Sequence, residues 1–448
     1  MDPTTPDTSS SQPSSSDPSG PDADFGAARP RGARIALLTS GILVLLLTLY
    51  MVGKFLHADF KDAEVWYDAG RRVLEGRTLT NLPHYRYPPT FAVLVAPFCA
   101  LGFAPFYFFW YLLNLCLLVP CVAAARAISF GPGEPAPYRS HWLPLLLVAV
   151  FAIDNLLLGQ TNILIMLLVY WAFLADARRR PWLSGLPLGA AIAIKAFPAP
   201  LLAYFLYRGR LRVVAAALLS CAFFLLLVPA PARGFHRNFR EVTDWGSRVV
   251  MPYLSRGEAG DWGQHSFDFG NHSLPAVARR LLTRADAGVA ARQDRPLFVN
   301  FADLTESQTN WILLAAFAAL GLAFIAASGW RRPSTPTERA VEYSMAVALM
   351  LLASALSWTY FFVMLLLPIT VALKLFADPA RLRPASIWVL RVSLWVLVLA
   401  IVLLWPAARP TQYVRAVGSL CWATVLLFAG LALARRDLRQ PPEHAPAP

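Results

Sequence analysis

Carboxylates gather in the stretch HADFKDAEVWYDAGRRVLEG, residues 57–76, which directly follows a long apolar run. A carboxylate that folding turns into an apolar enclosure holds a proton more readily than one in water, and such a group can accept a proton from a nucleophile. One acid of this stretch could therefore act as a general base. The alternative is that all of them are solvated loop charges. The acids are Asp59, Asp62, Glu64, Asp68 and Glu75.

A lysine interrupts another apolar run, IAIKAFP. Lys195 is one of only four lysines in the chain. A charge at such a place is costly unless it has a partner or reaches the membrane surface. Its ammonium could bind an anion, because developing negative charge is stabilised by a cation or oriented donors. The alternative is that the side chain extends to the lipid headgroups.

The longest polar segment, 231–309, carries hydrogen-bond donors in GNHSLPAVARRLL. Asn271 and His272 can donate hydrogen bonds to a polar or anionic ligand. Arg279 and Arg280 fall on an expected short helix and can pair with an oxyanion through two N–H groups. The alternatives are an ordinary surface histidine and arginines that face anionic lipid.

The composition indicates a protein that crosses a membrane many times. Of its 448 residues, 57% are hydrophobic and 15% are charged, which is too apolar for a soluble protein of this size. The formal charge of +13 comes mostly from arginine. Membrane proteins keep such an excess in cytoplasmic loops, so nucleic-acid binding is not expected. The five cysteines lie in apolar runs without disulfide or metal-ligand spacing.

About twelve apolar segments approach the length that crosses a bilayer, which predicts an all-α polytopic bundle. Arg29, Arg31 and Arg34 predict a cytoplasmic N-terminus, and only the arginines at 178–180 disagree with the topology that follows. The expected spans are 35–56, 88–104, 105–127, 142–157, 161–176, 183–206, 213–230, 310–329, 340–356, 358–376, 387–404 and 415–434.

Three parts follow along the chain. Residues 1–33 are rich in Ser, Pro, Asp and Gly and predict a disordered cytoplasmic tail. Residues 34–434 form the membrane domain, and 435–448 a second cytoplasmic tail. Two polar loops, 57–87 and 231–309, both fall on the non-cytoplasmic side in this topology, so they could build one site together.

The first of these loops has the pattern of an amphipathic helix. From Asp62 on, the side chains of Val65, Ala69, Val73 and Leu74 recur on one face. Such a helix places an acid at its beginning next to an apolar stripe, where the pKa of the carboxyl rises toward a useful range.

An ordered series of motifs covers roughly residues 35–375. It resembles the membrane-embedded glycosyltransferases of the GT-C class, in particular the polyprenyl-phosphate-mannose-dependent glycosyltransferase family 87, formerly DUF2029. The motifs are DAEVWYDAG (62–70), YRYPPTFAVLVAPF (85–98), LLGQTNILIMLL (157–168), LGAAIAIKAFPAPLL (188–202), GNHSLPAVARRLL (270–282), VNFADL (299–304) and SALSWTYFFVMLLLP (354–368).

The resemblance implies a GT-C-like bundle and a chemistry. A hexose, mannose in the family, leaves a polyprenyl phosphate and joins a hydroxyl of a lipid or glycan in an inverting displacement with an Asp as base. Asp62 matches the family's acid best by its spacing to the following Ala-Gly, and Asp59 is the alternative. Relatives often have a His shortly after Ser-Trp, where this chain has Tyr360.

The resemblance also implies binding residues. Those expected at the donor and its phosphate are Lys195, Asn271, His272, Arg279, Arg280 and Tyr360; those expected at the substrates are Tyr87, Gln160, Asn162 and Trp358.

Neither a metal nor another cofactor is expected, because the chain has no convincing cluster of metal ligands. The expected partners are the polyprenyl-phosphate sugar, a lipid or glycan acceptor and the bilayer. The expected location is the plasma membrane, with many passes and the active site on the non-cytoplasmic side. Two other functions stay open: a secondary transporter, although no repeated halves are visible, and a non-catalytic scaffold of the cell envelope.

Overall fold

A computed structural model describes residues 61–131, 134, 139–256, 265–288, 296–404 and 409–439. The chain divides into two compact units, 1–59 and 60–448, and all described residues belong to the second. The expected tail 1–33, the first expected span 35–56, the candidate base Asp59 and residues 440–448 lie outside the described residues.

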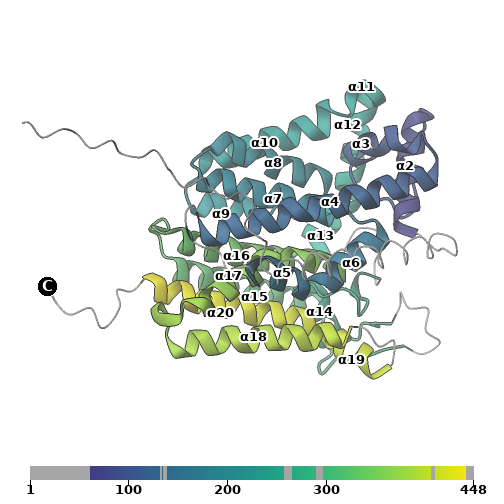
Figure 1. Ribbon diagram of the computed structural model, residues 1–448. Coiled ribbons are helices and arrows are strands. Elements are labelled where there is room, and N and C mark those ends of the chain that lie inside the picture. The colour runs from purple at the N-terminus through teal and green to yellow at the C-terminus, as the bar shows by residue number, and fades with distance from the viewer. Residues whose placement is uncertain are drawn as a thin grey trace, which may run out of the picture. The chain divides into compact units, whose positions relative to one another are not determined.

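The described chain is helical (Figure 1). Its only named elements are helices, and one isolated β-bridge joins Asn271 to Trp358. The elements are α2 (Lys61–Leu74), α3 (Pro89–Cys99), α4 (Phe103–Phe130), α5 (Arg139–Leu147), α6 (Ala149–Leu158), α7 (Asn162–Ala177), α8 (Pro181–Ile194), α9 (Leu201–Tyr207), α10 (Leu211–Ala222), the π-helical η1 (Phe223–Leu227), α11 (Ala230–Arg233), α12 (Phe235–Trp245), the π-helical η2 (Gly246–Val250), α13 (Met251–Arg256), α14 (Leu274–Leu282), α15 (Glu306–Ser328), α16 (Pro336–Ala353), the 3-10 helix η4 (Thr359–Leu365), α17 (Leu366–Ala377), the 3-10 helix η5 (Pro379–Arg381), α18 (Pro384–Val402), α19 (Arg409–Val417) and α20 (Ser419–Arg439).

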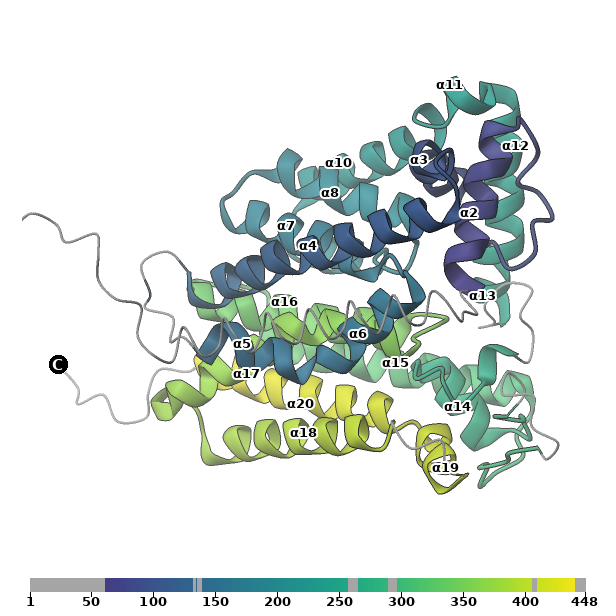
Figure 2. The same ribbon diagram turned by 45° about the vertical axis from the view of Figure 1, so that its right-hand side comes forward.

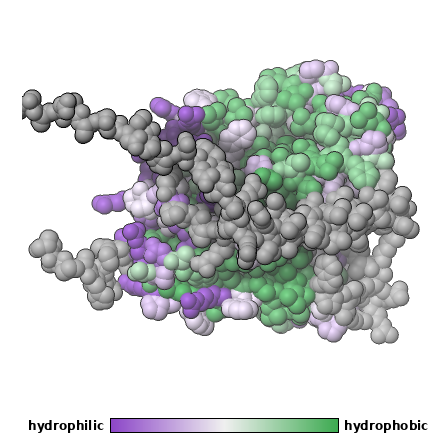
Figure 3. Space-filling model, in the orientation of Figure 1, coloured by the Kyte–Doolittle hydropathy of each residue, from purple (hydrophilic) through white to green (hydrophobic). Residues whose placement is uncertain are grey.

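Six stretches of the described chain are long and apolar enough to cross a membrane, and four shorter apolar helices accompany them. Figure 3 shows the apolar surface that these helices expose, with hydrophilic residues gathered toward one end. The prediction of an all-α polytopic membrane protein is confirmed. The long stretches are Phe103–Phe130, Leu211–Arg233, Glu306–Ser328, Thr359–Ala377, Pro384–Val402 and Ser419–Arg439; the short helices are α3, α6, α7 and α8.

One expected span, 183–206, is two helices. Helix α8 ends at Ile194, and Lys195 has an extended backbone, with φ −152° and ψ 116°. Pro198 and Pro200 follow, and proline cannot supply the N–H groups that a continuous helix needs. Lys195 therefore lies in an interruption between α8 and α9, where its side chain is not confined to a helix surface.

Helix α3 changes the topology expected from the sequence. It has 11 residues, about 16 Å at helical rise, and a bilayer core is about 30 Å thick. Beyond its end, Phe103 returns to α2, where its ring lies 5.4 Å from that of Tyr67. The segment 88–104 is therefore a short helix beside α2, too short to cross a bilayer by itself, and Figure 2 shows α3 next to α2.

The arginine-rich loops come to one end once 88–104 is no longer counted as a crossing and 183–206 is counted as the two helices α8 and α9. The loop 178–180 follows α7, and an ion pair of 3.2 Å joins Arg210 to Asp176 in the last turn of that helix. Arg208 Nη1 donates to the carbonyl oxygens of Gly329 and Arg331, each at 2.9 Å. The disagreement at 178–180 came from counting 88–104 as a span and 183–206 as a single crossing.

A buried ionic cluster holds this arginine-rich end together. The Glu342 side chain is fully buried in α16 and pairs with Arg208 and Arg435. Arg435 also pairs with Glu338 at 3.0 Å. The cluster ties the end of α9 to α16 and α20, since each carboxylate needs a partner once it has left water.

Candidate active site

The sequence periodicity of α2 explains how it presents Asp62. Ala63, Trp66, Ala69 and Val73 are buried, and they recur at the spacing of one helix face. The expectation of an amphipathic helix from Asp62 onward is confirmed. It is wrong for Leu74, which is 46% exposed because it falls beside the buried stripe and not on it.

Asp62 lies at the beginning of α2 and accepts a hydrogen bond of 2.7 Å from Gln160 Nε2. Burial raises the pKa of Asp62 above its ordinary value of 3.8, while the hydrogen bond from Gln160 and the positive charge of Lys195 act in the opposite direction. The carboxylate is thus more basic than one in water, which is what a general base requires.

Lys195 extends its ammonium into the same region. Its Nζ donates to Asn162 Oδ1 at 2.9 Å and lies 4.0 Å from the centre of the Phe361 ring. The rings of Tyr87 and Tyr360 are 5.6 and 5.7 Å away. An ammonium has three donors, and the one hydrogen bond to Asn162 leaves capacity for an anionic ligand.

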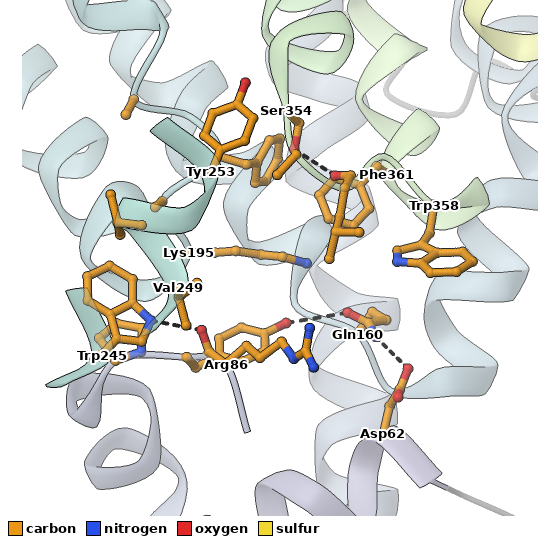
Figure 4. Close-up of a pocket in the computed structure, with 18 of the residues that line it drawn as sticks. Asp62, Arg86, Gln160, Lys195, Trp245, Val249, Tyr253, Ser354, Trp358 and Phe361 are labelled. Carbon is orange, nitrogen blue, oxygen red and sulfur yellow. Dashed lines mark hydrogen bonds between the residues drawn. The ribbon is translucent and has the colours of Figure 1, made fainter. Parts of the chain in front are cut away.

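A pocket of about 610 Å³ contains both groups, a size typical of small-molecule sites. In Figure 4, Lys195 and Arg86 extend from one side of the pocket toward Gln160 and Asp62 on the other. Most of the remaining wall is apolar or aromatic. The lining includes Val65, Trp66, His84 and Tyr87 from the first polar loop, Trp245, Val249, Val250 and Tyr253 from the second, and Leu158, Phe197, Pro200, Trp358, Tyr360 and Phe361.

Of the residues predicted for catalysis and binding, six line this pocket. They are Asp62, Tyr87, Gln160, Lys195, Trp358 and Tyr360. Asn162 is buried behind the lining and reaches the pocket only through Lys195.

The four predicted donor-binding residues of the second loop are not in the lining. Asn271 Oδ1 accepts from the backbone N–H of Ser357 at 2.9 Å and from that of Ser273 at 3.1 Å. Arg280 Nη1 donates to backbone carbonyls, that of Asp268 at 2.7 Å among them. Arg279 Nη2 donates to Asn310 Oδ1 at 2.9 Å. Their role in binding the donor stays a prediction.

His272 lies among these residues and is fully buried. Neither ring nitrogen has a hydrogen-bond partner in the described part of the chain, and the ring packs edge-on against Phe362. Burial, together with the positive charges of Arg280 and Arg415, lowers the pKa of His272 well below its ordinary value. The imidazole is therefore neutral.

Several lining residues were not predicted from the sequence. Arg86 stands out, because its guanidinium points into the pocket (Figure 4), and its backbone carbonyl accepts a hydrogen bond of 2.8 Å from Trp245 Nε1. The motif YRYPP places this arginine between two tyrosines and next to a proline-led helix, which is the pattern that could have drawn attention to it. Trp245 and Tyr253 had no comparable signature.

A metal site is not formed by the described residues, among which no group of three His, Cys, Asp or Glu side chains is placed to hold an ion. The expectation of metal-independent chemistry stays a prediction.

The apolar helices define a multi-pass membrane protein, and its pocket has charged groups beside apolar and aromatic walls. The chain belongs to glycosyltransferase family 87, whose sequence profile matches residues 85–355. The family predicted from the ordered motifs is confirmed, and with it the prediction of a glycosyltransferase enzyme.

Curated relatives come from mycobacteria. A polyprenol-phosphate-mannose-dependent alpha-(1-2)-phosphatidylinositol mannoside mannosyltransferase of Mycobacterium tuberculosis is 34% identical over 200 residues, which cover 39% of this chain and 46% of the relative. The protein of the same name in Mycolicibacterium smegmatis is 28% identical over 398 residues, 80% of each chain. An alpha-(1->3)-arabinofuranosyltransferase of M. tuberculosis is 32% identical over 143 residues, 30% of this chain and 32% of the relative. The chain thus spans less than half the length of the first relative. No solved structure is significantly similar to this chain.

Proposed function

We propose that the protein transfers mannose from a polyprenyl-phosphate donor to a hydroxyl of a lipid or glycan acceptor. The observation that carries the proposal is the enclosure of the Asp62 carboxylate and the Lys195 ammonium in one pocket with apolar and aromatic walls. The two relatives that share a dependence on polyprenol-phosphate mannose in their names support the donor.

In this proposal Asp62 is the general base. The acceptor hydroxyl gives its proton to Asp62 as its oxygen attacks the anomeric carbon of the sugar. A bond forms between the acceptor oxygen and that carbon, and the bond from the same carbon to the phosphate oxygen breaks. Because the attack comes from the face opposite the phosphate, the configuration inverts. Asp59 is the alternative base from the same loop.

The departing polyprenyl phosphate gains negative charge in this step. Lys195, with its two remaining N–H donors, and the Arg86 guanidinium lie where they could stabilise that charge. Tyr87, Trp358 and Tyr360 would contact the sugar, because aromatic faces and hydroxyls suit a pyranose ring. Asn271 would act from behind, by holding the segment 354–358 in place. Binding of the donor by His272, Arg279 and Arg280 stays a prediction.

The surrounding architecture would be a GT-C-like bundle, with the membrane domain at 34–434 and the pocket on the non-cytoplasmic side of the plasma membrane. Residues 57–87 and 231–309 would both lie on that side, because each supplies part of the pocket wall. The apolar wall formed by Val249, Val250 and Pro200 would receive the first isoprene units of the donor.

The test is transfer by purified full-length protein in liposomes. The donor is polyprenyl-phosphate mannose labelled in the sugar, and the acceptor is a phosphatidylinositol mannoside. We expect labelled acceptor with wild-type protein and none with protein heated before the assay. Labelled donor that enters the vesicle lumen without transfer would instead indicate a transporter. Neither transfer nor uptake, from a correctly folded protein, would contradict the proposal and favour a scaffold.

A further inference from the structure

One tight turn connects the two charged groups of the pocket. Helix α6 ends at Gly159, which has a left-handed backbone with φ 67° and ψ 28°. A side chain there would be strained, and its Cβ would lie 3.4 Å from Ala63 of α2. Trp110 Nε1 donates to the Gly159 carbonyl oxygen. Ala63 of α2 and Trp110 of α4 therefore fix the position of Gly159 before α7 begins at Asn162.

Gln160 in this turn is oriented by two partners. Its Nε2 donates to Asp62 Oδ2 at 2.7 Å, and its Oε1 accepts from Tyr87 Oη at 3.4 Å. The residue is only 4% exposed. The amide therefore has its N–H side toward the carboxylate, and this donor favours the ionised form of Asp62 over the protonated form.

Asn162, two residues further on, contacts Lys195, the second charged group of the pocket. Its Oδ1 accepts from Lys195 Nζ at 2.9 Å. The residue is fully buried and does not line the pocket. Since Lys195 lies in a helix interruption with an extended backbone, this hydrogen bond fixes the direction in which its flexible side chain points.

We propose that the Gly159–Asn162 turn is a positioning element, in which Gln160 orients the Asp62 carboxylate and Asn162 orients the Lys195 ammonium. The two residues are then positioning residues and not sugar contacts. This inference rests on the proposed function of the same pocket. One loop sets the separation between the group that accepts the proton of the acceptor and the group that binds the phosphate of the donor, so the two substrates are held at a fixed distance from each other.

The first test replaces the amide of Gln160 by a thioether of similar length, Gln160→Met. A hydrogen bond to a charged group is worth about tenfold or more in an equilibrium constant, so the ratio of ionised to protonated Asp62 at a given pH should fall by about that factor. The measurement is the infrared carbonyl band of the protonated carboxyl in purified protein as a function of pH. The band is identified by its loss in Asp62→Asn.

Gln308→Met is the matched control, because Gln308 caps α15 and has no contact with the pocket. It should leave the titration of Asp62 unchanged. A Gln160→Met titration that coincides with that of the control would overturn the positioning role. Should Gln160→Met fail to fold, Gln160→Asn keeps the amide but shortens its reach, and the same comparison applies.

The second test is Asn162→Leu, read by the affinity of the purified protein for polyprenyl phosphate without a sugar. We expect binding to weaken by about tenfold, with the infrared titration of Asp62 changed less than in Gln160→Met. Unchanged affinity would overturn the role of Asn162. Both readouts are independent of turnover. If wild-type protein transferred no mannose, the proposed function would fail while these measurements still decided the inference.

Discussion

Replacing Asp62 by Asn is the sharpest perturbation of the proposed mechanism. Asn has the shape of Asp, and its side-chain oxygen can still accept the 2.7 Å hydrogen bond that Gln160 Nε2 donates. The substitution therefore removes basicity with little change in geometry. General-base catalysis contributes about 10²- to 10⁴-fold, which corresponds to about 2.7–5.4 kcal/mol of activation free energy. We expect kcat to fall by that factor, with the KM for the donor changed little.

The assay is mannose transfer in liposomes, measured over a range of pH. The rate of the wild-type protein should rise with pH as Asp62 loses its proton, with a midpoint above 3.8 because burial raises the pKa of this carboxyl. Asp62→Asn should lack that rise. Asp68→Asn is the matched control, since it removes the same charge from an exposed position of α2. If Asp62→Asn kept the kcat of Asp68→Asn, Asp62 would not be the base.

Stability gives an independent check on the same carboxyl. A raised pKa means that the folded protein binds a proton that the unfolded chain has already released. The free energy of unfolding therefore falls as pH rises from 3.8 to the pKa of folded Asp62, and is constant above it. Asp62→Asn should not show this fall. If the free energy of unfolding depended on pH in the same way for both proteins, the raised pKa of Asp62 would be contradicted.

Three further predictions follow from other parts of the molecule. Lys195→Met should raise the KM for the polyprenyl-phosphate donor by at least about tenfold, because a charged hydrogen bond to the phosphate is lost; steady-state kinetics would show it, and an unchanged KM would mean that the ammonium does not bind donor. Glu342→Gln should lower the free energy of unfolding by about 3–5 kcal/mol, because Arg208 loses its buried carboxylate partner and Arg435 loses one of two; denaturant unfolding in detergent measures this, and a change no larger than that of an exposed acid would refute the reasoning. EDTA should leave the transfer rate unchanged, and a loss that Mg²⁺ or Mn²⁺ restores would show that a metal takes part.

The sequence located two charged groups of the pocket, Asp62 and Lys195, because each is out of keeping with its surroundings. Lys195 interrupts an apolar run, and Asp62 begins an amphipathic helix, so both carried a recognisable pattern. Asn271 and Arg280 lie in a polar loop, where a donor that binds a backbone carbonyl looks the same in sequence as one that binds a ligand. Only the folded structure separates the two cases, since the tertiary fold decides which backbone carbonyl, such as that of Asp268, lies next to Arg280.

The helix arrangement was predictable in kind but not in number. Apolar runs identify membrane helices well, yet they do not show where a helix stops. The segment 88–104 is apolar enough to count as a span, but it folds as the short helix Pro89–Cys99 packed on α2. The run 183–206 is interrupted at Lys195 by the prolines that follow. Both errors arise because hydropathy records composition, whereas crossing depends on continuous length.

The mixed lining of the pocket has a practical consequence for handling the protein. A detergent with a sugar head and an alkyl tail has the same division into polar and apolar parts as the lining, in which Lys195 and Arg86 lie near Val249 and Phe361. Alkyl maltosides used for extraction would thus occupy the cavity as competing ligands. Kinetic constants measured in such micelles would reflect that competition.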